Sequence, residues 1–293
     1  MSRRHLLTGA GALLVLAACG DDSTSSAGQT AGTSGNAGTE PDPGTTGFTI
    51  AQRYPSNTFV PGVVRLPISI ANKDSLMTTG PSQLDGRVLD SNDKQIATVS
   101  APIHSKDLVI PYWAVNVQID LPGTYTLRLD GDDGFGAAFI VSDPATVTVP
   151  YIGSLLPPFD TPTVDNHRGV EPYCSLTPNP CPLHDVTLTQ ALASGKPVAY
   201  MVGTPAHCQT GTCAPALEVL VKSHARLGDA VVMVHADVYS DAAGTTVAPA
   251  VNALGLDYEP VLYLVKGDGI VKDRIDVIWD QAELDARLDA FLA

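Results

Sequence analysis

The chain has 293 residues, of which 31 are Asp or Glu and 17 are Lys or Arg, so its formal net charge is −14. This acidic excess argues against a nucleic-acid-binding or anionic-membrane-binding surface, because either surface needs a basic patch. The length is sufficient for two domains of ordinary size.

The first residues are typical of an export signal. The twin arginines Arg3 and Arg4 precede an apolar core at residues 13–16, which is too short to span a bilayer as a helix. The sequence from Leu16 to Cys19 resembles the bacterial lipobox, in which the cysteine becomes the lipidated first residue. We therefore expect a lipoprotein signal peptide at 1–19, export by the Tat route, and a lipid anchor at Cys19 outside the cytoplasm. The alternative is an ordinary cleaved signal with a chance cysteine.

The composition then changes twice. Residues 20–47 are mostly Gly, Ser, Thr, Ala and Asp, which predicts a disordered tether. Residues 48–149 are expected to be all-β, because short β-branched or alternating runs separated by turns occur at 63–70, 87–90, 95–99, 112–119, 124–129 and 137–141. The Gly-x-Tyr sequence within 121–127 resembles the corner of immunoglobulin-like domains, so an immunoglobulin-like β-sandwich is expected. His104 is isolated there and is interpreted as structural.

From residue 150 onward, strand and helix patterns alternate, and we expect a second domain at 150–293. Thr187 and Gln190 have the spacing of a helix capping box. Helices are expected after Thr187, from Pro215, near 247–254, and after Asp280, and strands at 198–202, 230–234, 260–265 and 270–275. The order β-α-β-α-β-β-α predicts a mixed sheet covered by helices.

Four cysteines remain besides Cys19, and their spacing alone leaves all three possible pairings open. Cys208 and Cys213 lie between the strand 198–202 and the helix that begins near Pro215. A helix N-terminus carries partial positive charge and free N–H donors, which favour a thiolate over a thiol. The sequence therefore predicts a reactive cysteine pair at this position.

This order of elements, with a cysteine pair between a strand and a helix, resembles the thioredoxin fold over roughly the last half of the chain. Residues 152–159 also resemble the entry segment of peroxiredoxin-like and membrane-anchored thioredoxin-like proteins. The resemblance implies an α/β thioredoxin-like domain, with Cys208 as the nucleophile and Cys213 as the resolving thiol. It further implies a cis-proline at Pro260, next to Glu259.

The function implied is thiol–disulfide exchange with extracytoplasmic protein thiols, supported by a membrane redox partner and without a cofactor. The Cys-x4-Cys spacing departs from the two intervening residues of thioredoxins, and His207 replaces the usual tryptophan. A protonated His207 would lower the pKa of Cys208. Glu259 would either shuttle a proton or face solvent.

Two alternatives stay open for this pair. One is a non-catalytic thioredoxin-fold binding module in which the cysteines form structural disulfides. The other is a Sco-like copper-delivery protein, because soft thiolates suit Cu(I). In that case His235, at the end of a predicted strand, is the candidate third ligand.

Cys174 and Cys181 enclose a proline-rich loop, which predicts a structural disulfide in an exported protein. A second redox pair that feeds Cys208 is the alternative. The neighbouring His184 and Asp185 are interpreted as solvated polar residues, with a role as ligands as the alternative.

Overall fold

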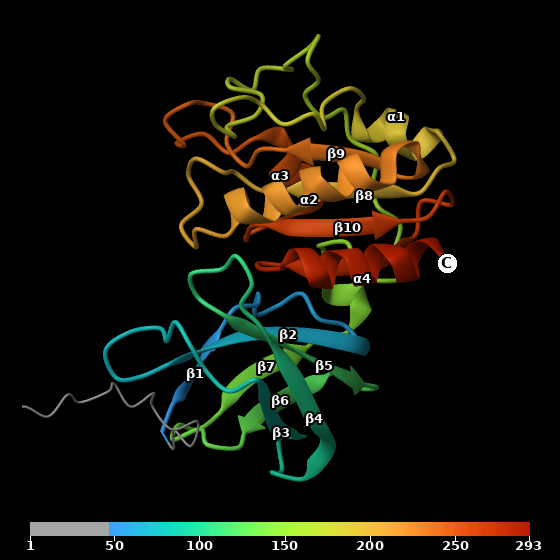
Figure 1. The fold of residues 1–293 in the computed structure, drawn as a ribbon. Coiled ribbons are helices and arrows are strands. Elements are labelled where there is room, and N and C mark those ends of the chain that lie inside the picture. Colours follow the sequence, from blue (N-terminus) through green and yellow to red (C-terminus); the bar gives the residue numbers. More distant parts are fainter. Residues whose placement is uncertain (1–46) are drawn as a thin grey trace, which may run out of the picture. The chain divides into compact units, whose positions relative to one another are not determined.

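The computed structural model describes residues 47–293 (Figure 1), so the predicted signal peptide, Cys19 and the tether before residue 47 lie outside it. The first sheet has seven strands in the order β1-β2-β5-β4-β3-β6-β7. Their bounds are β1 Thr49–Gln52, β2 Gly62–Ala71, β3 Gln83–Leu89, β4 Gln95–His104, β5 Tyr112–Ile119, β6 Gly123–Leu129 and β7 Ala137–Val141.

Alternation of apolar and polar residues explains these strands. In β3 and β7 every second side chain is buried, which is the pattern of a strand with one face on a core. Trp113, Leu127 and Phe139 are among the residues that fill this core. The predicted tyrosine corner contact is present, since the Tyr125 hydroxyl donates a hydrogen bond to the Leu121 carbonyl oxygen at 2.8 Å.

The expected immunoglobulin-like sandwich is nevertheless wrong, because these strands form one continuous sheet. The long strand β4 pairs with β3 over most of its length and with β5 through Ile103 and His104, so it joins what would be two sheets. Strand β1, which the sequence did not predict, pairs with β2. Its Gln52 side chain donates a hydrogen bond to the Ala138 carbonyl oxygen of β7, so the sheet closes almost into a barrel.

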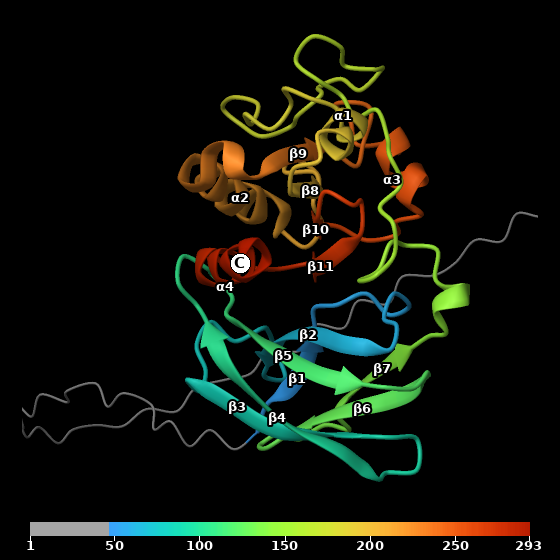
Figure 2. The same ribbon diagram turned by 90° about the vertical axis from the view of Figure 1, so that its right-hand side faces the viewer.

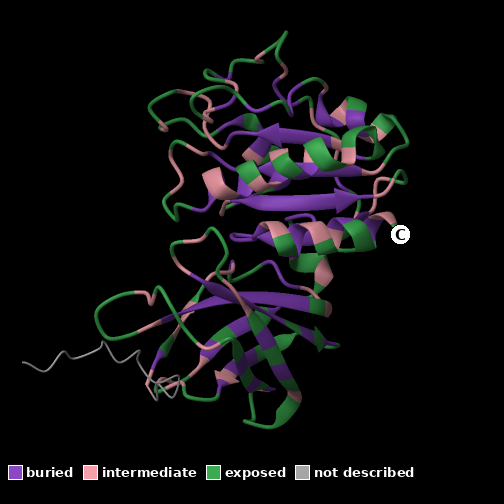
Figure 3. Ribbon diagram, viewed as in Figure 1, coloured by how far each residue is buried: buried purple, intermediate pink, exposed green. Residues whose placement is uncertain are grey.

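The second sheet has four strands in the order β11-β10-β8-β9. Strands β8 (Val198–Val202) and β9 (Val232–Ala236) are parallel, whereas β10 (Val261–Val265) is antiparallel to both β8 and β11 (Val271–Asp276). Every residue of β8 and β10 is buried (Figure 3). The sequences of such strands are continuously apolar, because both faces of the sheet are covered.

Helices cover this sheet on its two faces (Figure 2). On one face, α2 (Cys213–Leu227) and α4 (Gln281–Leu292) pack over Ala199 and Met201 of β8. On the other face, α1 (Leu188–Ala193) and α3 (Pro249–Leu254) pack over the alternate residues of β8. No helix among the described residues is both long and apolar enough to cross a bilayer.

The capping box predicted at the start of α1 is confirmed. Thr187 and Gln190 form the capping box of α1, in which each side chain accepts a hydrogen bond from the other residue's backbone N–H. Gly228 follows the last residue of α2, and Gly255 ends α3 in the left-handed conformation. These local signals depend only on neighbouring residues.

We expected an α/β thioredoxin-like domain preceded by an all-β sandwich. The pairing of the strands shows that this fold class is wrong. Eight of the nine strand pairs among the described residues are antiparallel. The four α-helices there are 6, 15, 6 and 12 residues long. The described chain is therefore a mainly antiparallel β protein with few helices. The order of elements along a sequence does not determine how the strands pair.

A buried ion pair joins β2 to α4 within the compact unit that spans residues 42–293. Arg65 donates hydrogen bonds from Nε and Nη2 to the two carboxylate oxygens of Glu283, each at 2.7 Å. The Tyr112 hydroxyl donates a third to Glu283 at 2.7 Å. Because α4 packs against α2, this pair also supports the helix that begins at Cys213.

Candidate functional site

Cys208 and Cys213 form a disulfide between the loop that follows β8 and the first residue of α2. Their Cα atoms are 5.9 Å apart. Between them Gly211 has a φ of +68°, a conformation that side-chain-bearing residues rarely adopt, so glycine lets the loop fold back. Cys208 is half-buried and Cys213 is fully buried. A partner thiol therefore reaches Cys208 more easily than Cys213.

Hydrogen-bond donors surround the Cys208 sulfur. The backbone N–H of Cys213 donates to Cys208 Sγ at 3.2 Å. This amide opens α2, where N–H groups have no intrahelical partner, and the first turn of α2 contains no acidic residue. The Thr210 hydroxyl lies 3.2 Å from the same sulfur. In the reduced pair, this N–H and the helix dipole would stabilise a thiolate on Cys208.

A carboxyl group lies beside the second sulfur. Glu259 Oε2 accepts a hydrogen bond from the Thr204 backbone N–H at 2.6 Å and lies 3.4 Å from Cys213 Sγ. Burial raises the pKa of the Glu259 carboxyl above its ordinary value, although the Thr204 N–H opposes this. The Glu259–Pro260 peptide bond is cis, as expected from the sequence. The carboxyl is thus placed to take a proton from Cys213 or return one to it.

His207 contacts residues outside this pair. Its Nε2 lies 3.1 Å from the Ala242 carbonyl oxygen, and its ring packs edge-on against Tyr239. A Cβ atom at Gly244 would lie 2.7 Å from the imidazole, so glycine leaves room for the ring. The proposed effect of His207 on the pKa of Cys208 stays a prediction from the sequence.

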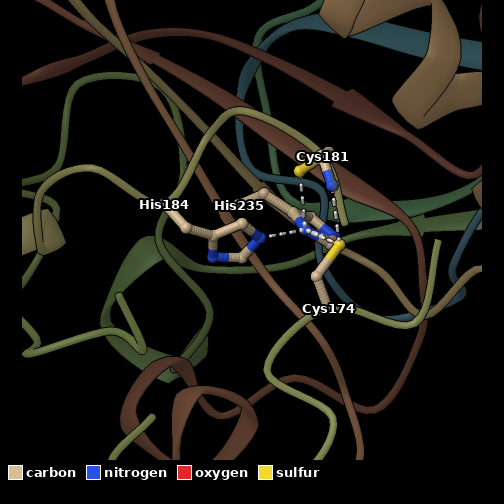
Figure 4. Close-up of side chains that lie close together, drawn as sticks. All are labelled: Cys174, Cys181, His184 and His235. Carbon is tan, nitrogen blue, oxygen red and sulfur yellow. Dashed lines mark hydrogen bonds between the residues drawn. The ribbon is translucent and has the colours of Figure 1, made fainter. Parts of the chain in front are cut away.

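Cys174 and Cys181 are both free and buried, so the disulfide predicted between them is not formed in the structure. They lie instead beside two histidines, His184 and His235 (Figure 4). The expected copper ligand His235 therefore belongs to this second group, not to Cys208 and Cys213. We call these four residues the Cys–His cluster.

The remaining candidate residues are structural or solvated. Asp185 is exposed, which agrees with a solvated polar residue, but the same interpretation is wrong for His184, which is fully buried. His104 lies 3.0 Å from the Asp280 carboxylate and stacks on Tyr112, as expected for a structural histidine. Sequence reasoning missed the convergence of His184 and His235 on the cysteines. The Cys-x6-Cys-x2-His spacing was a signal for three of these four residues.

Comparison with known proteins does not identify the chain. No family model matches the sequence, and no curated protein matches it. The resemblance to the thioredoxin-like superfamily therefore stays an expectation from the sequence.

Proposed function

We propose that this protein exchanges disulfides with protein thiols through Cys208 and Cys213. The observation that carries the proposal is the hydrogen bond from the Cys213 backbone N–H to Cys208 Sγ at 3.2 Å. A donor at a helix N-terminus stabilises the thiolate, which is the attacking species in disulfide exchange. The unequal burial of the two cysteines supports different roles for them.

The exchange proceeds in two steps from the reduced pair. The Cys208 thiolate attacks one sulfur of a client disulfide, forms a mixed disulfide and releases one client thiolate. The Cys213 thiolate then attacks the Cys208 sulfur, re-forms the Cys208–Cys213 disulfide and releases the second client thiolate. Two electrons pass from the pair to the client, and the reverse reaction oxidises a client dithiol. The relative reduction potentials decide the direction.

Glu259 serves the second step. Cys213 is fully buried, so its proton has no direct access to water. The Glu259 carboxylate, 3.4 Å from Cys213 Sγ, accepts this proton as the thiolate forms. The raised pKa of Glu259 brings it closer to that of the thiol, which makes the transfer easier.

The N-terminal sequence indicates where the reaction takes place. The twin arginines and the lipobox-like sequence ending at Cys19 favour an exported, lipid-anchored protein. An oxidising compartment also suits the disulfide observed between Cys208 and Cys213. The clients are then extracytoplasmic protein thiols or disulfides, and a membrane redox partner resets the pair.

Alkylation of the reduced protein at a series of pH values tests the proposal. We expect Cys208 to react with iodoacetamide at neutral pH faster than an ordinary cysteine, whose pKa is about 8.5. Cys213 serves as the internal comparison, because it is buried and should react more slowly. Peptide mapping assigns each rate to its cysteine. If Cys208 reacts no faster than a free cysteine, a structural disulfide is the better account.

A further inference from the structure

The Cys–His cluster gathers four ligand atoms in the interior of the protein (Figure 4). Cys174, Cys181 and His184 come from the segment before α1, and His235 comes from β9. The cysteines are 3% and 4% exposed, and both histidines are 0% exposed. The two sulfurs and one nitrogen from each ring all lie within 4.8 Å of one another.

The hydrogen bonds of the two histidines leave one unprotonated nitrogen on each ring, and this nitrogen points into the cluster. His235 Nε2 lies 2.8 Å from the Gly203 carbonyl oxygen, and His184 Nδ1 lies 3.3 Å from the Pro162 carbonyl oxygen. A carbonyl oxygen only accepts, so these two nitrogens carry the hydrogens. In the neutral rings, His235 Nδ1 and His184 Nε2 then have only lone pairs, and they are 3.2 Å apart. Two lone pairs this close repel unless positive charge lies between them.

Three of the six distances between the ligand atoms match those of a tetrahedral metal site. His235 Nδ1 lies 3.8 Å from Cys174 Sγ and 3.6 Å from Cys181 Sγ. Tetrahedral zinc, with its usual bond lengths, places two nitrogens about 3.4 Å apart and a nitrogen and a sulfur about 3.6 Å apart. A single proton would bridge only one pair of these atoms, whereas one metal ion bonds all four.

The charge of the cluster favours a divalent ion. Two thiolates balance Zn²⁺, whereas Cu⁺ would leave a net negative charge buried, which is costly. Four protein ligands also make a closed site, which is typical of structural zinc. We infer that Cys174, Cys181, His184 and His235 bind one structural Zn²⁺.

This ion would hold the segment before α1 against the end of the sheet. The His235 backbone N–H donates to the Leu183 carbonyl oxygen at 3.1 Å, so the segment already follows β9. The ring of His235 also bonds Gly203, the residue after β8. The next residue, Thr204, bonds the Glu259 carboxylate. The zinc site thus supports the loop that leads to Cys208 without taking part in exchange.

Metal analysis of the purified full-length chain tests this inference. We expect one zinc per chain by mass spectrometry of the metal content, and no disulfide between Cys174 and Cys181. The variants Cys174→Ser and His235→Ala should each bind zinc at least tenfold more weakly. His167→Ala is the matched control and should keep one zinc, because His167 is partly exposed and pairs with Glu171. The double variant Cys208→Ser, Cys213→Ser should also keep one zinc, whether or not the wild-type protein exchanges disulfides.

A second measurement needs no variant and does not depend on folding of the mutants. Cobalt(II) added to the zinc-depleted wild-type chain should give the intense visible bands of tetrahedral cobalt and a thiolate-to-cobalt charge-transfer band. Zinc should then remove both. Octahedral cobalt spectra, copper bound with no zinc, or a metal-free Cys174–Cys181 disulfide would each overturn the inference.

Discussion

The ion pair between Arg65 and Glu283 allows a quantitative test of how β2 is joined to α4. The substitution Arg65→Met keeps a long apolar side chain but removes the guanidinium. Glu283 then stays buried in the first turn of α4, with the Tyr112 hydroxyl and Arg287 Nε, at 2.7 Å and 3.0 Å, as its remaining side-chain partners. The side chains of Arg65 and Glu283 are only 7% and 8% exposed, so water would compensate little of the loss.

The pKa of Glu283 sets the size of the effect. Burial by itself raises this pKa, but the charge and hydrogen bonds of Arg65 overcome burial and lower it from 4.5 to about 2. The difference corresponds to about 3 kcal/mol of folding free energy. Removing one partner of a buried ion pair costs a similar amount, about 3–5 kcal/mol. We expect Arg65→Met to lower the free energy of unfolding by about 3 kcal/mol at pH 7.

The pH dependence gives the sign of the effect. Because the pKa of Glu283 is lower in the folded state, its stabilising contribution is complete above pH 4.5 and is lost as the pH falls toward about 2. Urea unfolding of wild type and Arg65→Met at pH 7 and pH 3 should therefore show a smaller difference at pH 3. Arg87→Met is the control, because Arg87 pairs with Asp130 at the surface and should cost less than about 1 kcal/mol. A loss below about 1 kcal/mol for Arg65→Met at pH 7, or one that does not change with pH, would refute the reasoning.

Three further predictions each concern a single residue. Glu259→Gln should slow resolution of a mixed disulfide on Cys208 by about tenfold or more at pH 7, because general acid–base groups contribute at least this much. Stopped-flow kinetics measures the rate of this resolution, and an unchanged rate would argue against proton transfer by Glu259. In wild type, the rate of resolution should decrease at pH values below the raised pKa of Glu259, because the carboxyl is then protonated. The rate of the Glu259→Gln variant should not show this pH dependence. Thr187→Ala removes the capping box of α1 and should cost about 1 kcal/mol in urea unfolding, and no loss would mean that the cap is not stabilising. Cys19→Ala should release the protein from membranes, and a variant that still fractionates with them would contradict the lipid anchor.

Elements that depend on neighbouring residues were predictable. The predicted strand 198–202 matches β8, and the predicted strand 260–265 matches β10 except for Pro260, because both faces of these strands are buried and their sequences are uniformly apolar. The strand predicted at 230–234 is instead β9, Val232–Ala236. The polar residue His235 ended the apolar pattern too early, although it is fully buried in the Cys–His cluster.

Features that depend on distant residues were not predictable from the local pattern. The sandwich prediction failed because nothing in the sequence of β4 indicates that Ile103 and His104 pair with β5. The Cys–His cluster was missed because His184 and His235 are 51 residues apart and meet only through the fold. The Cys208–Cys213 disulfide, in contrast, joins residues only five apart, and the sequence predicted this pair.

Trapping of a mixed disulfide tests thiol–disulfide exchange most directly. The reduced variants Cys213→Ser and Cys208→Ser are each mixed with a protein disulfide, and the adducts are mapped by mass spectrometry. We expect Cys213→Ser to accumulate a mixed disulfide on Cys208, because no thiol is left to resolve it, and Cys208→Ser to accumulate little. Equal trapping on both variants, or no adduct on Cys208, would contradict the proposed roles and leave the Cys208–Cys213 disulfide as a structural bond.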